Sequence, residues 1–416
     1  MAVPQSWRRT EFADDPTGPL GDLRVLDLSR LVAGNMASLQ LADFGADVVK
    51  VEPLPAGDPL RAWRQKGKAT FWKTYARNKR SLGLDFHGAG ALDLLRDLMA
   101  RADVMIESFR PGTLEEMGLG PDVIARDFPR LILLRISGFG QTGPYSPRPG
   151  FGTLVEGLSG FAHRNGEAGG DPLLPPLALA DMISGLYGVS AVMMALRARD
   201  ASGRGQVIDL ALLEAMVSVL GPEPLDYRLN GAPKPRVGNG SNTSSPRNVY
   251  RSRDGHFIAI SASVQRAAER LFRTIGRDDM NKDPRYATNE ARVAHRAEVD
   301  AIVGNWIGAH DRDEAMQIFT QDGITAAPLY SIEDIVRDPH YLQRGVFIEA
   351  PDEDLGSAPT HAPLPRLSAT PANLWRPAPR LGQHGREVLA DYGVAPERGD
   401  RLIASGTVLS EGDVSE

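Results

Sequence analysis

The sequence of 416 residues contains no cysteine, and this absence excludes disulfides, thiolate catalysis and cysteine-based metal sites. No uninterrupted apolar run approaches the roughly 18 residues that indicate a membrane span. The formal net charge of −6 argues against nucleic acid or an anionic membrane as a partner, although a local basic patch would still fit a phosphate-bearing ligand. We expect a cytoplasmic protein that binds neither nucleic acid nor membranes.

The common motifs of nucleotide, metal and hydrolase sites are also missing. The first βα turn reads SRLVAGNMAS (29–38) and lacks the G-x-G-x-x-G fingerprint, so a nicotinamide dehydrogenase is not supported. No P-loop, H-E-x-x-H or G-x-S-x-G motif occurs. The eight histidines are scattered, and His87 and His163 fit surface or loop positions better than catalytic ones. We expect no metal and no redox cofactor.

The first half of the sequence does contain a regular alternation of strand and helix patterns. Helical periodicity is found at residues 33–45, 88–102, about 182–197 and 212–220. Apolar runs typical of strands are found at residues 24–29, 47–52, 103–108, 131–137 and 207–212. This alternation predicts an α/β fold with an open, mostly parallel sheet covered by helices.

The residue composition of the sequence changes near Gly221. Residues 231–248 are rich in glycine, proline, serine and asparagine, which predicts a loop. The stretch that follows predicts a hairpin with its turn at Asp254-Gly255, and then two polar helical segments. We therefore expect three parts, which are a large domain in residues 1–227, a small domain in residues 228–330 and a segment in residues 331–416 that completes the large domain.

Two loops follow predicted parallel strands, and both have an unusual composition. SFRPG (108–112) places an arginine and an aromatic residue after one strand, and GFGQTGPYSPRPGFG (138–152) follows the next. The carboxyl ends of parallel strands share one edge of the sheet, where such folds bind ligands. Arg30, in the first βα loop, is expected at the same edge. Simple turn chemistry, with glycine and proline supplying special backbone angles, is the alternative interpretation.

Asp181 is the one ionisable group in the apolar segment PPLALADMISGLYG (175–188). Burying a carboxylate there is costly unless another group pairs with it or uses it. One interpretation is a helix N-cap, because aspartate is preferred where a helix begins. The other is a nucleophilic carboxylate that forms a covalent acyl intermediate. The local sequence does not separate these two interpretations, and they are compatible.

Several stretches, taken in order, resemble the class III CoA-transferases (CaiB/BaiF family), which include formyl-CoA and carnitine CoA-transferases and methylacyl-CoA racemases. The similar stretches are GDLRVLDLSRLVAGNMASLQLADFGADVVKVEP, NKRSLGLDF, ADVMIESFRPGTLEEMGLG, PRLILLRISGFGQTGPY, ALADMISGLYG, SGRGQVIDLALLEA, HAPLPRLSATP and APRLGQHGREVLADYG. The resemblance implies a Rossmann-like large domain built from both chain ends, and a smaller α+β middle domain. It also implies a homodimer of interlocked rings.

The resemblance further implies an acyl-CoA:carboxylate CoA-transferase that acts on an acyl-CoA and a small carboxylic acid. Asp181 falls on the catalytic aspartate of the family, which would form an aspartyl-CoA thioester. The residues that align with coenzyme A contacts, or lie on the neighbouring loops, are Arg30, Leu84, Ser108, Phe109, Arg110, Ser137, Gly138, Arg148 and Phe151. Because some basic residues of relatives are missing here, Lys79 and Arg80 are further candidates for phosphate contacts.

Related activities remain alternatives, namely an acyl-CoA racemase, an intramolecular CoA isomerase or a catalytically silent CoA-binding protein. Racemases of the family carry a histidine where this chain has Phe151, and phenylalanine cannot transfer a proton, so racemisation is disfavoured. The glycine-containing stretch 237–245 is a candidate lid, and backbone N–H groups near Gly138 are candidate oxyanion donors. If the acids are dicarboxylic, Arg148 or Arg164 is expected to hold the distal carboxylate.

Overall fold

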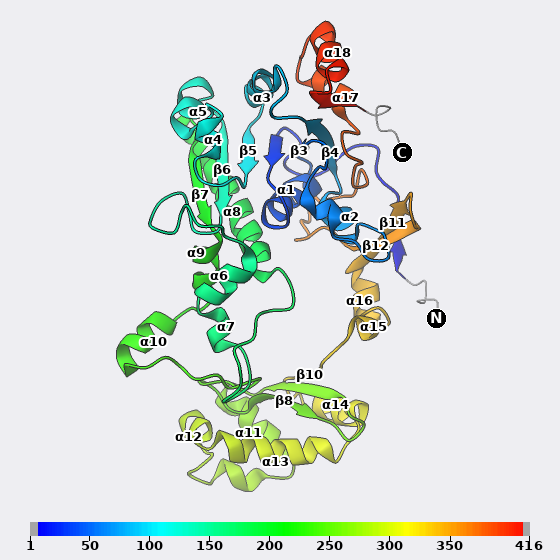
Figure 1. The fold of residues 1–416 in the computed structure, drawn as a ribbon. Helices are drawn as coiled ribbons and strands as arrows, with labels where there is room; N and C mark the ends of the chain where they lie inside the picture. Colours follow the sequence, from blue (N-terminus) through cyan, green and yellow to red (C-terminus); the bar gives the residue numbers. More distant parts are fainter. Residues whose placement is uncertain (1–6, 411–416) are drawn as a thin grey trace. The chain divides into compact units, whose positions relative to one another are not determined.

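The computed structural model describes residues 7–410, and in it the chain forms two compact units (Figure 1). The first unit combines the chain up to Phe161 with Pro175–Gly221 and with the chain from Pro339 onward. The second unit consists of Ala162–Leu174 and Pro222–Asp338. The assignment of residues 1–227, 228–330 and 331–416 to functional domains stays a prediction.

A seven-stranded sheet forms the centre of the first unit. Its neighbouring strands run parallel, except that the last strand, β13, pairs antiparallel with β4. The predicted α/β fold with a mostly parallel sheet is thus confirmed. In spatial order the strands are β13 (Val408–Leu409), β4 (Lys79–Leu84), β3 (Asp47–Pro53), β2 (Arg24–Leu28), β5 (Val104–Glu107), β6 (Ile132–Ser137) and β7 (Val207–Ala211).

Helices pack on both faces of this sheet, because alternate side chains of each strand point to opposite faces. On β2, Val25 packs in one hydrophobic cluster and Leu26 in the other. The Val25 side is covered by α1 (Ala33–Asp43), α8 (Leu179–Ser202) and α9 (Leu212–Ser218). The Leu26 side is covered by α3 (Ala91–Met99), α4 (Thr113–Glu116), α5 (Pro121–Asp127), α17 (Gly385–Asp391) and α18 (Pro396–Ala404).

Shorter elements complete the first unit. The antiparallel pair β11 (Phe347–Asp352) and β12 (Gly356–His361) forms a small sheet with β1 (Arg8–Arg9). The helix α6 (Gly152–Leu158) packs against α8 and α9. The other helices are η1 (Pro59–Ala62), α2 (Thr70–Tyr75) and α16 (Pro339–Arg344), while α7 (Phe161–Arg164) lies where the chain passes into the second unit.

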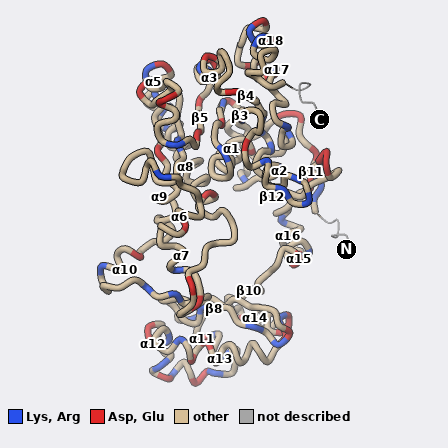
Figure 2. Tube along the Cα trace, in the orientation of Figure 1, with Lys and Arg blue, Asp and Glu red and all other residues tan. Residues whose placement is uncertain are grey.

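The second unit has its own antiparallel sheet, in the order β10 (Ala326–Pro328), β9 (Phe257–Ser261) and β8 (Arg247–Arg251). The predicted hairpin is confirmed, since β8 and β9 pair antiparallel and Gly255 takes a φ of +83° at the turn. Basic and acidic residues are interspersed along its helices (Figure 2). These helices are α10 (Glu223–Asn230), α11 (Gln265–Thr274), η2 (Asp278–Asn281), α12 (Asn289–Ala294), α13 (Arg296–Gly308), α14 (Arg312–Gln321) and α15 (Ile332–Ile335).

Helix α8 is long and apolar enough, by length and composition alone, to cross a membrane. In the described residues one of its faces packs against α1, α9 and the strands β6 and β7. Residues buried on that face include Gly188, Val192 and Leu196. The core helix of a soluble protein has the same features, so α8 is weak evidence for a membrane span.

Candidate active site

A cavity of about 280 Å³ opens in the first unit at the carboxyl ends of the central strands. Strands β2, β5 and β6 are parallel neighbours, so the loops that follow them meet at one edge of the sheet. Residues at or just before the starts of α6, α8 and α9 also line it. The lining residues are Arg30, Leu31, Ala33, Ser108, Phe109, Arg110, Pro111, Ile136, Ser137, Gly138, Ser146, Arg148, Pro149, Gly150, Phe151, Asp181 and Leu212.

Most residues that the sequence analysis singled out line this one cavity. Apart from Asp181, they are Arg30, Ser108, Phe109, Arg110, Ser137, Gly138, Arg148 and Phe151. They come from chain segments far apart in the sequence, and the parallel sheet brings them together. Their roles in binding and catalysis stay predictions.

Leu84 is the predicted contact residue that does not line the cavity. Its side chain is fully buried in the hydrophobic cluster on the Leu26 side of the sheet. In the sheet it pairs with Pro53 on one side and Val408 on the other. The position therefore contributes to the packing of β4, and its side chain is closed to a ligand.

Lys79 and Arg80, which the sequence analysis considered as phosphate contacts, are placed elsewhere by the structure. The Nζ of Lys79 lies 3.4 Å from Asp27 Oδ2 in the buried layer beneath α1, and burial lowers the pKa of Lys79 to about 8. Arg80 forms ion pairs of 2.5 Å with Asp47 and 2.6 Å with Asp391. Both cations already have acidic partners, and neither lines the cavity, so their expected role as phosphate contacts is wrong.

Asp181 is the third residue of α8, which begins at Leu179 after the N-cap residue Ala178. The interpretation of Asp181 as the N-cap is therefore wrong. The predicted start near residue 182 was also too late, because the apolar side chains ahead of Asp181 pack as the first turn. The carboxylate of Glu156, in α6, instead accepts a hydrogen bond of 3.1 Å from the Ala180 N–H at the start of α8. The Asp181 side chain therefore does not cap the helix, and it lines the cavity.

The environment of Asp181 disfavours its charged form. Burial, followed by the nearby negative charge of Glu156, raises the pKa of Asp181 from its ordinary value of 3.8 to about 6. The backbone N–H groups of Asp181 itself and of Ala33 act in the opposite direction and favour the carboxylate. Near neutral pH the group is ionised but poorly solvated, which suits a nucleophile.

The loop after β2 is held in place by a buried ion pair. The N–H of Leu31, a residue with a φ of +63°, donates 3.0 Å to Asp58, whose other oxygen lies 3.1 Å from Lys50 Nζ. The next residue back, Arg30, donates its N–H 2.9 Å to the hydroxyl of Ser108. Lys50 and Asp58 were not predicted from the sequence to support the site. The lysine in the apolar strand DVVKVE was the available signal.

The loop after β5 is fixed in a similar way. The carboxylate of Glu107 accepts the Phe109 N–H at 2.6 Å and the Arg135 Nε at 2.8 Å. Arg135 in turn pairs with Glu115 at 2.7 Å. Burial raises the pKa of Glu107, while the hydrogen bond from Arg135 opposes this effect. These contacts of Glu107 fix the backbone at Phe109, which lines the cavity.

The glycine-rich loop after β6 folds back on itself at the cavity. A Cβ at Gly138 would lie 2.5 Å from the Cα of Gly150, so two backbone segments touch here with no room for a side chain. The Gly140 N–H donates 3.0 Å to the hydroxyl of Ser137. That N–H is therefore engaged within the loop, and the oxyanion role considered for this region stays a prediction.

Three arginines line the cavity without acidic partners. Among the described residues no carboxylate forms an ion pair with Arg30, Arg110 or Arg148. The guanidinium of Arg148 lies 3.8 Å from the ring centre of Tyr145. Cations left unpaired beside a single aspartate give the cavity a positive character, which suits anionic ligands.

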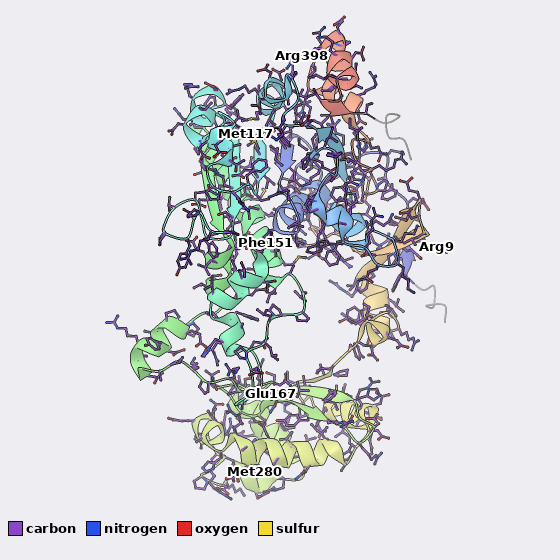
Figure 3. All side chains as sticks on the ribbon, in the orientation of Figure 1. Arg9, Met117, Phe151, Glu167, Met280 and Arg398 are labelled. Carbon is purple, nitrogen blue, oxygen red and sulfur yellow. The ribbon has the colours of Figure 1, made fainter. Side chains whose placement is uncertain are left out.

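Arg164 and His163 belong to the second unit and do not line this cavity. Arg164 Nε pairs with Glu223 at 3.0 Å, so the guanidinium is already neutralised. Phe151, labelled in Figure 3, is the residue before α6, and it is 60% exposed. The described residues contain no group of three or more His, Cys, Asp or Glu side chains that would hold a metal.

The chain is similar to known proteins over most of its length. The chain matches the family described as CoA-transferase family III over residues 20–385. It is 36% identical to the succinyl-CoA–D-citramalate CoA-transferase of Chloroflexus aurantiacus, over 90% of this chain and 94% of that one. It is also 36% identical to the succinate–glutarate CoA-transferase of Agrobacterium fabrum, over 90% and 95% of the two chains. Human succinyl-CoA:glutarate CoA-transferase is 30% identical, over 96% and 90%.

Solved structures show the same likeness. A CaiB/BaiF family protein from Brucella suis has a TM-score of 0.79 and 33% identity, covering 90% of this chain and 100% of that one. A hypothetical protein from Mycobacterium tuberculosis has a TM-score of 0.79 and 30% identity, with the same coverage. The chain belongs to CoA-transferase family III, and it is an enzyme of the CoA-transferase class.

Proposed function

We propose that this enzyme moves coenzyme A between an acyl-CoA and a carboxylic acid through a thioester on Asp181. The observation that carries the proposal is that one cavity contains a poorly solvated carboxylate together with three arginines that form no ion pair. The carboxylate supplies a nucleophile, and the arginines suit the phosphates and carboxylates of such substrates. A CoA-derived substrate would be held by this chain without a metal or redox cofactor.

The first half of the reaction transfers coenzyme A from the acyl group of the donor to Asp181 of the enzyme. The Asp181 carboxylate attacks the thioester carbonyl of the acyl-CoA, the C–S bond breaks, and a mixed anhydride and CoA thiolate form. The thiolate then attacks the aspartyl carbonyl of the anhydride. The C–O bond breaks, the original acid leaves as a carboxylate, and CoA remains on Asp181 as a thioester.

The second half runs the same steps with the acceptor. The acceptor carboxylate attacks the aspartyl thioester, which gives a new mixed anhydride and CoA thiolate. The thiolate attacks the acyl carbonyl of the acceptor, forming the product acyl-CoA and restoring the Asp181 carboxylate. No proton is gained or lost over the cycle. The anhydride must be protected from water, so we propose that a loop closes during the reaction; the candidate lid at residues 237–245 stays a prediction.

We propose small dicarboxylic acids as substrates, with succinyl-CoA as a donor. The named relatives act on succinyl-CoA or succinate and on glutarate or citramalate, all of which carry a second carboxylate. Arg148 lines the cavity beside Asp181 and has no acidic partner, whereas Arg164 is paired with Glu223. Arg148 is therefore the arginine we assign to the distal carboxylate.

The assembly and location of the enzyme belong to the same proposal. We propose an intertwined homodimer in the cytoplasm, with a Rossmann-like CoA-binding domain formed from both ends of each chain. The racemase alternative lacks support at the cavity, where Phe151 offers no group that transfers a proton. No specific observation favours the isomerase or the silent binder.

Isotope exchange tests this function without knowledge of the acceptor. Incubating the enzyme with succinyl-CoA and carbon-13 succinate should produce labelled succinyl-CoA, because the first half-reaction is reversible. Asp181→Ala should produce none while still binding CoA. Binding without exchange in the wild-type enzyme, across several acyl-CoAs and their acids, would favour the silent binder. Incorporation of deuterium at the α-carbon in deuterated water would favour the racemase.

A further inference from the structure

Helix α6 meets the start of α8 through two residues one helical turn apart, Gly152 and Glu156. Positions four apart in a helix lie on the same face, so both residues face the helix that carries Asp181. Both are buried. Glu156 is the one charged residue of α6, whose sequence is GTLVEGL.

The space beside Gly152 is occupied by the nucleophile. A Cβ at Gly152 would lie 2.4 Å from Asp181 Oδ2, which is closer than any stable contact. The φ of Gly152 lies outside the left-handed region, so its backbone angles do not require glycine. What a side chain at this position would displace is the carboxylate of Asp181.

Glu156 holds the backbone of the same helix. Its side chain is 2% exposed, and its Oε1 accepts the Ala180 N–H at 3.1 Å. Ala178, the N-cap residue of α8, has no side-chain oxygen with which to do this. Among the described residues no Lys, Arg or His forms an ion pair with Glu156. The hydrogen bond from the Ala180 N–H is therefore the polar contact that its carboxylate makes.

We propose that α6 positions Asp181 through this pair, Gly152 leaving room for the carboxylate and Glu156 capping the helix that bears it. The inference rests on the proposed role of Asp181 as the nucleophile. Gly152 and Glu156 are positioning residues, since they act on the reaction through Asp181. Reacting atoms must meet within a narrow range of distance and angle, and a displacement of about 1 Å can cost about 100-fold in rate.

Two alanine variants of α6 separate positioning from folding. Gly152→Ala should lower the rate of succinate exchange by about 10- to 100-fold, because the new methyl group pushes the carboxylate aside. The affinity for CoA and the melting temperature should not fall, since alanine favours helices over glycine. Gly157→Ala is the matched control, because its Cβ would meet nothing within 4 Å in the same helix. It should exchange at the wild-type rate.

Two variants of Glu156 test the cap. Glu156→Leu removes the acceptor for the Ala180 N–H and should lower both the exchange rate and the melting temperature. Glu156→Gln keeps an acceptor oxygen and should restore most of the rate at pH 8. It also removes a negative charge beside Asp181, so the acidic limb of its pH profile should move to lower pH. A residue needed only for folding would not move that limb.

The outcomes distinguish this inference from the proposed function. If the wild-type enzyme shows no exchange, the function itself fails. If it exchanges and Gly152→Ala matches Gly157→Ala, then Gly152 does not position the carboxylate and the inference is overturned. If Glu156→Leu folds and exchanges at the wild-type rate, the cap has no part in catalysis. Should Glu156→Leu fail to fold, the Gly152→Ala and Glu156→Gln results still decide the question.

Discussion

At the scale of single residues, Asp181 shows how the fold sets the strength of a nucleophile. Burial and the charge of Glu156 weaken its charged form, while two backbone N–H groups support it. The balance leaves the carboxylate ionised at neutral pH but with little solvent to shield it. Three unpaired arginines around it then supply the attraction for an anionic substrate.

This balance predicts a pH profile. Because the pKa of Asp181 is raised to about 6, the carboxylate should be largely protonated below that pH and lose its nucleophilicity. The value of kcat/KM should fall about tenfold for each pH unit below 6 and level off above 7. Initial rates of CoA transfer between pH 4.5 and 8.5 measure this. An acidic limb at pH 4 or lower would contradict the raised pKa.

The same shift predicts a cost in stability. The folded pKa of about 6 exceeds the ordinary 3.8, so the folded state binds the proton more tightly and stability falls as pH rises from about 4 to 6. Asp181→Asn should remove this cost and stabilise the protein by about 3 kcal/mol at pH 8. At pH below 4 the two proteins should be equally stable. Urea unfolding at both pH values tests this, and a less stable variant at pH 8 would refute it.

Arg148 predicts a difference between classes of acid. Arg148→Met should raise KM for dicarboxylic acids by about tenfold or more, because a charged hydrogen bond to the distal carboxylate is lost. KM for monocarboxylic acids of similar length should change little. Arg164→Met is the control, since Arg164 is paired with Glu223 and does not line the cavity. An equal rise in KM for both classes of acid would remove the assignment.

At the scale of helices and strands, loops that follow parallel strands are fixed by buried ion pairs beneath them. Lys50 lies between Asp27 at 3.2 Å and Asp58 at 3.1 Å, with none of these side chains reaching solvent. Asp58 in turn accepts the N–H of Leu31, which lines the cavity. Buried charged residues of the sheet thus fix the loop that lines the cavity.

Loss of the buried lysine should be costly. Lys50→Met leaves the buried Asp58 without a cation and Asp27 with Lys79 alone, and it should destabilise the protein by about 3–5 kcal/mol. Lys68→Met, which breaks a surface pair with Asp354, should change stability by at most about 1 kcal/mol. Urea unfolding of the two variants gives the comparison. A loss of 1 kcal/mol or less for Lys50→Met would show that this cluster does not hold the loop.

These elements also show what the sequence allowed us to predict. Strands such as β2 and β6 and helices such as α3 follow from local apolar patterns, and so do the loops at the sheet edge. Strand β4 was harder to predict, because Lys79 and Arg80 look like surface residues and are paired only in the fold. The cap on α8 was missed for a similar reason, since Glu156 and Ala180 are distant in sequence. Glu156 gave the same signal as Asp181, a lone carboxylate in an apolar segment.

At the scale of the whole molecule, each chain exposes an apolar surface on α8 that the proposed homodimer would bury. The solvent-facing side of α8 exposes large apolar groups, among them Leu186, Tyr187 and Met194. Exposed apolar area of this kind is typical of protein interfaces. Light scattering should give a mass twice the 45.0 kDa of the chain, unchanged on dilution because interlocked chains cannot separate while folded. A monomer at micromolar concentration would contradict the proposed assembly.

In the proposed mechanism, Asp181 carries coenzyme A as a thioester during the reaction. Intact-mass spectrometry of the enzyme mixed with succinyl-CoA tests it most directly, with hydroxylamine or borohydride added to trap the thioester. Without a trapping agent we predict a mass increase of one CoA less one water. With hydroxylamine or borohydride CoA is displaced, and a hydroxamate or alcohol should map to Asp181 and be absent from Asp181→Ala. Rapid exchange of labelled succinate into succinyl-CoA, with no modification of Asp181 under any trapping condition, would contradict the claim.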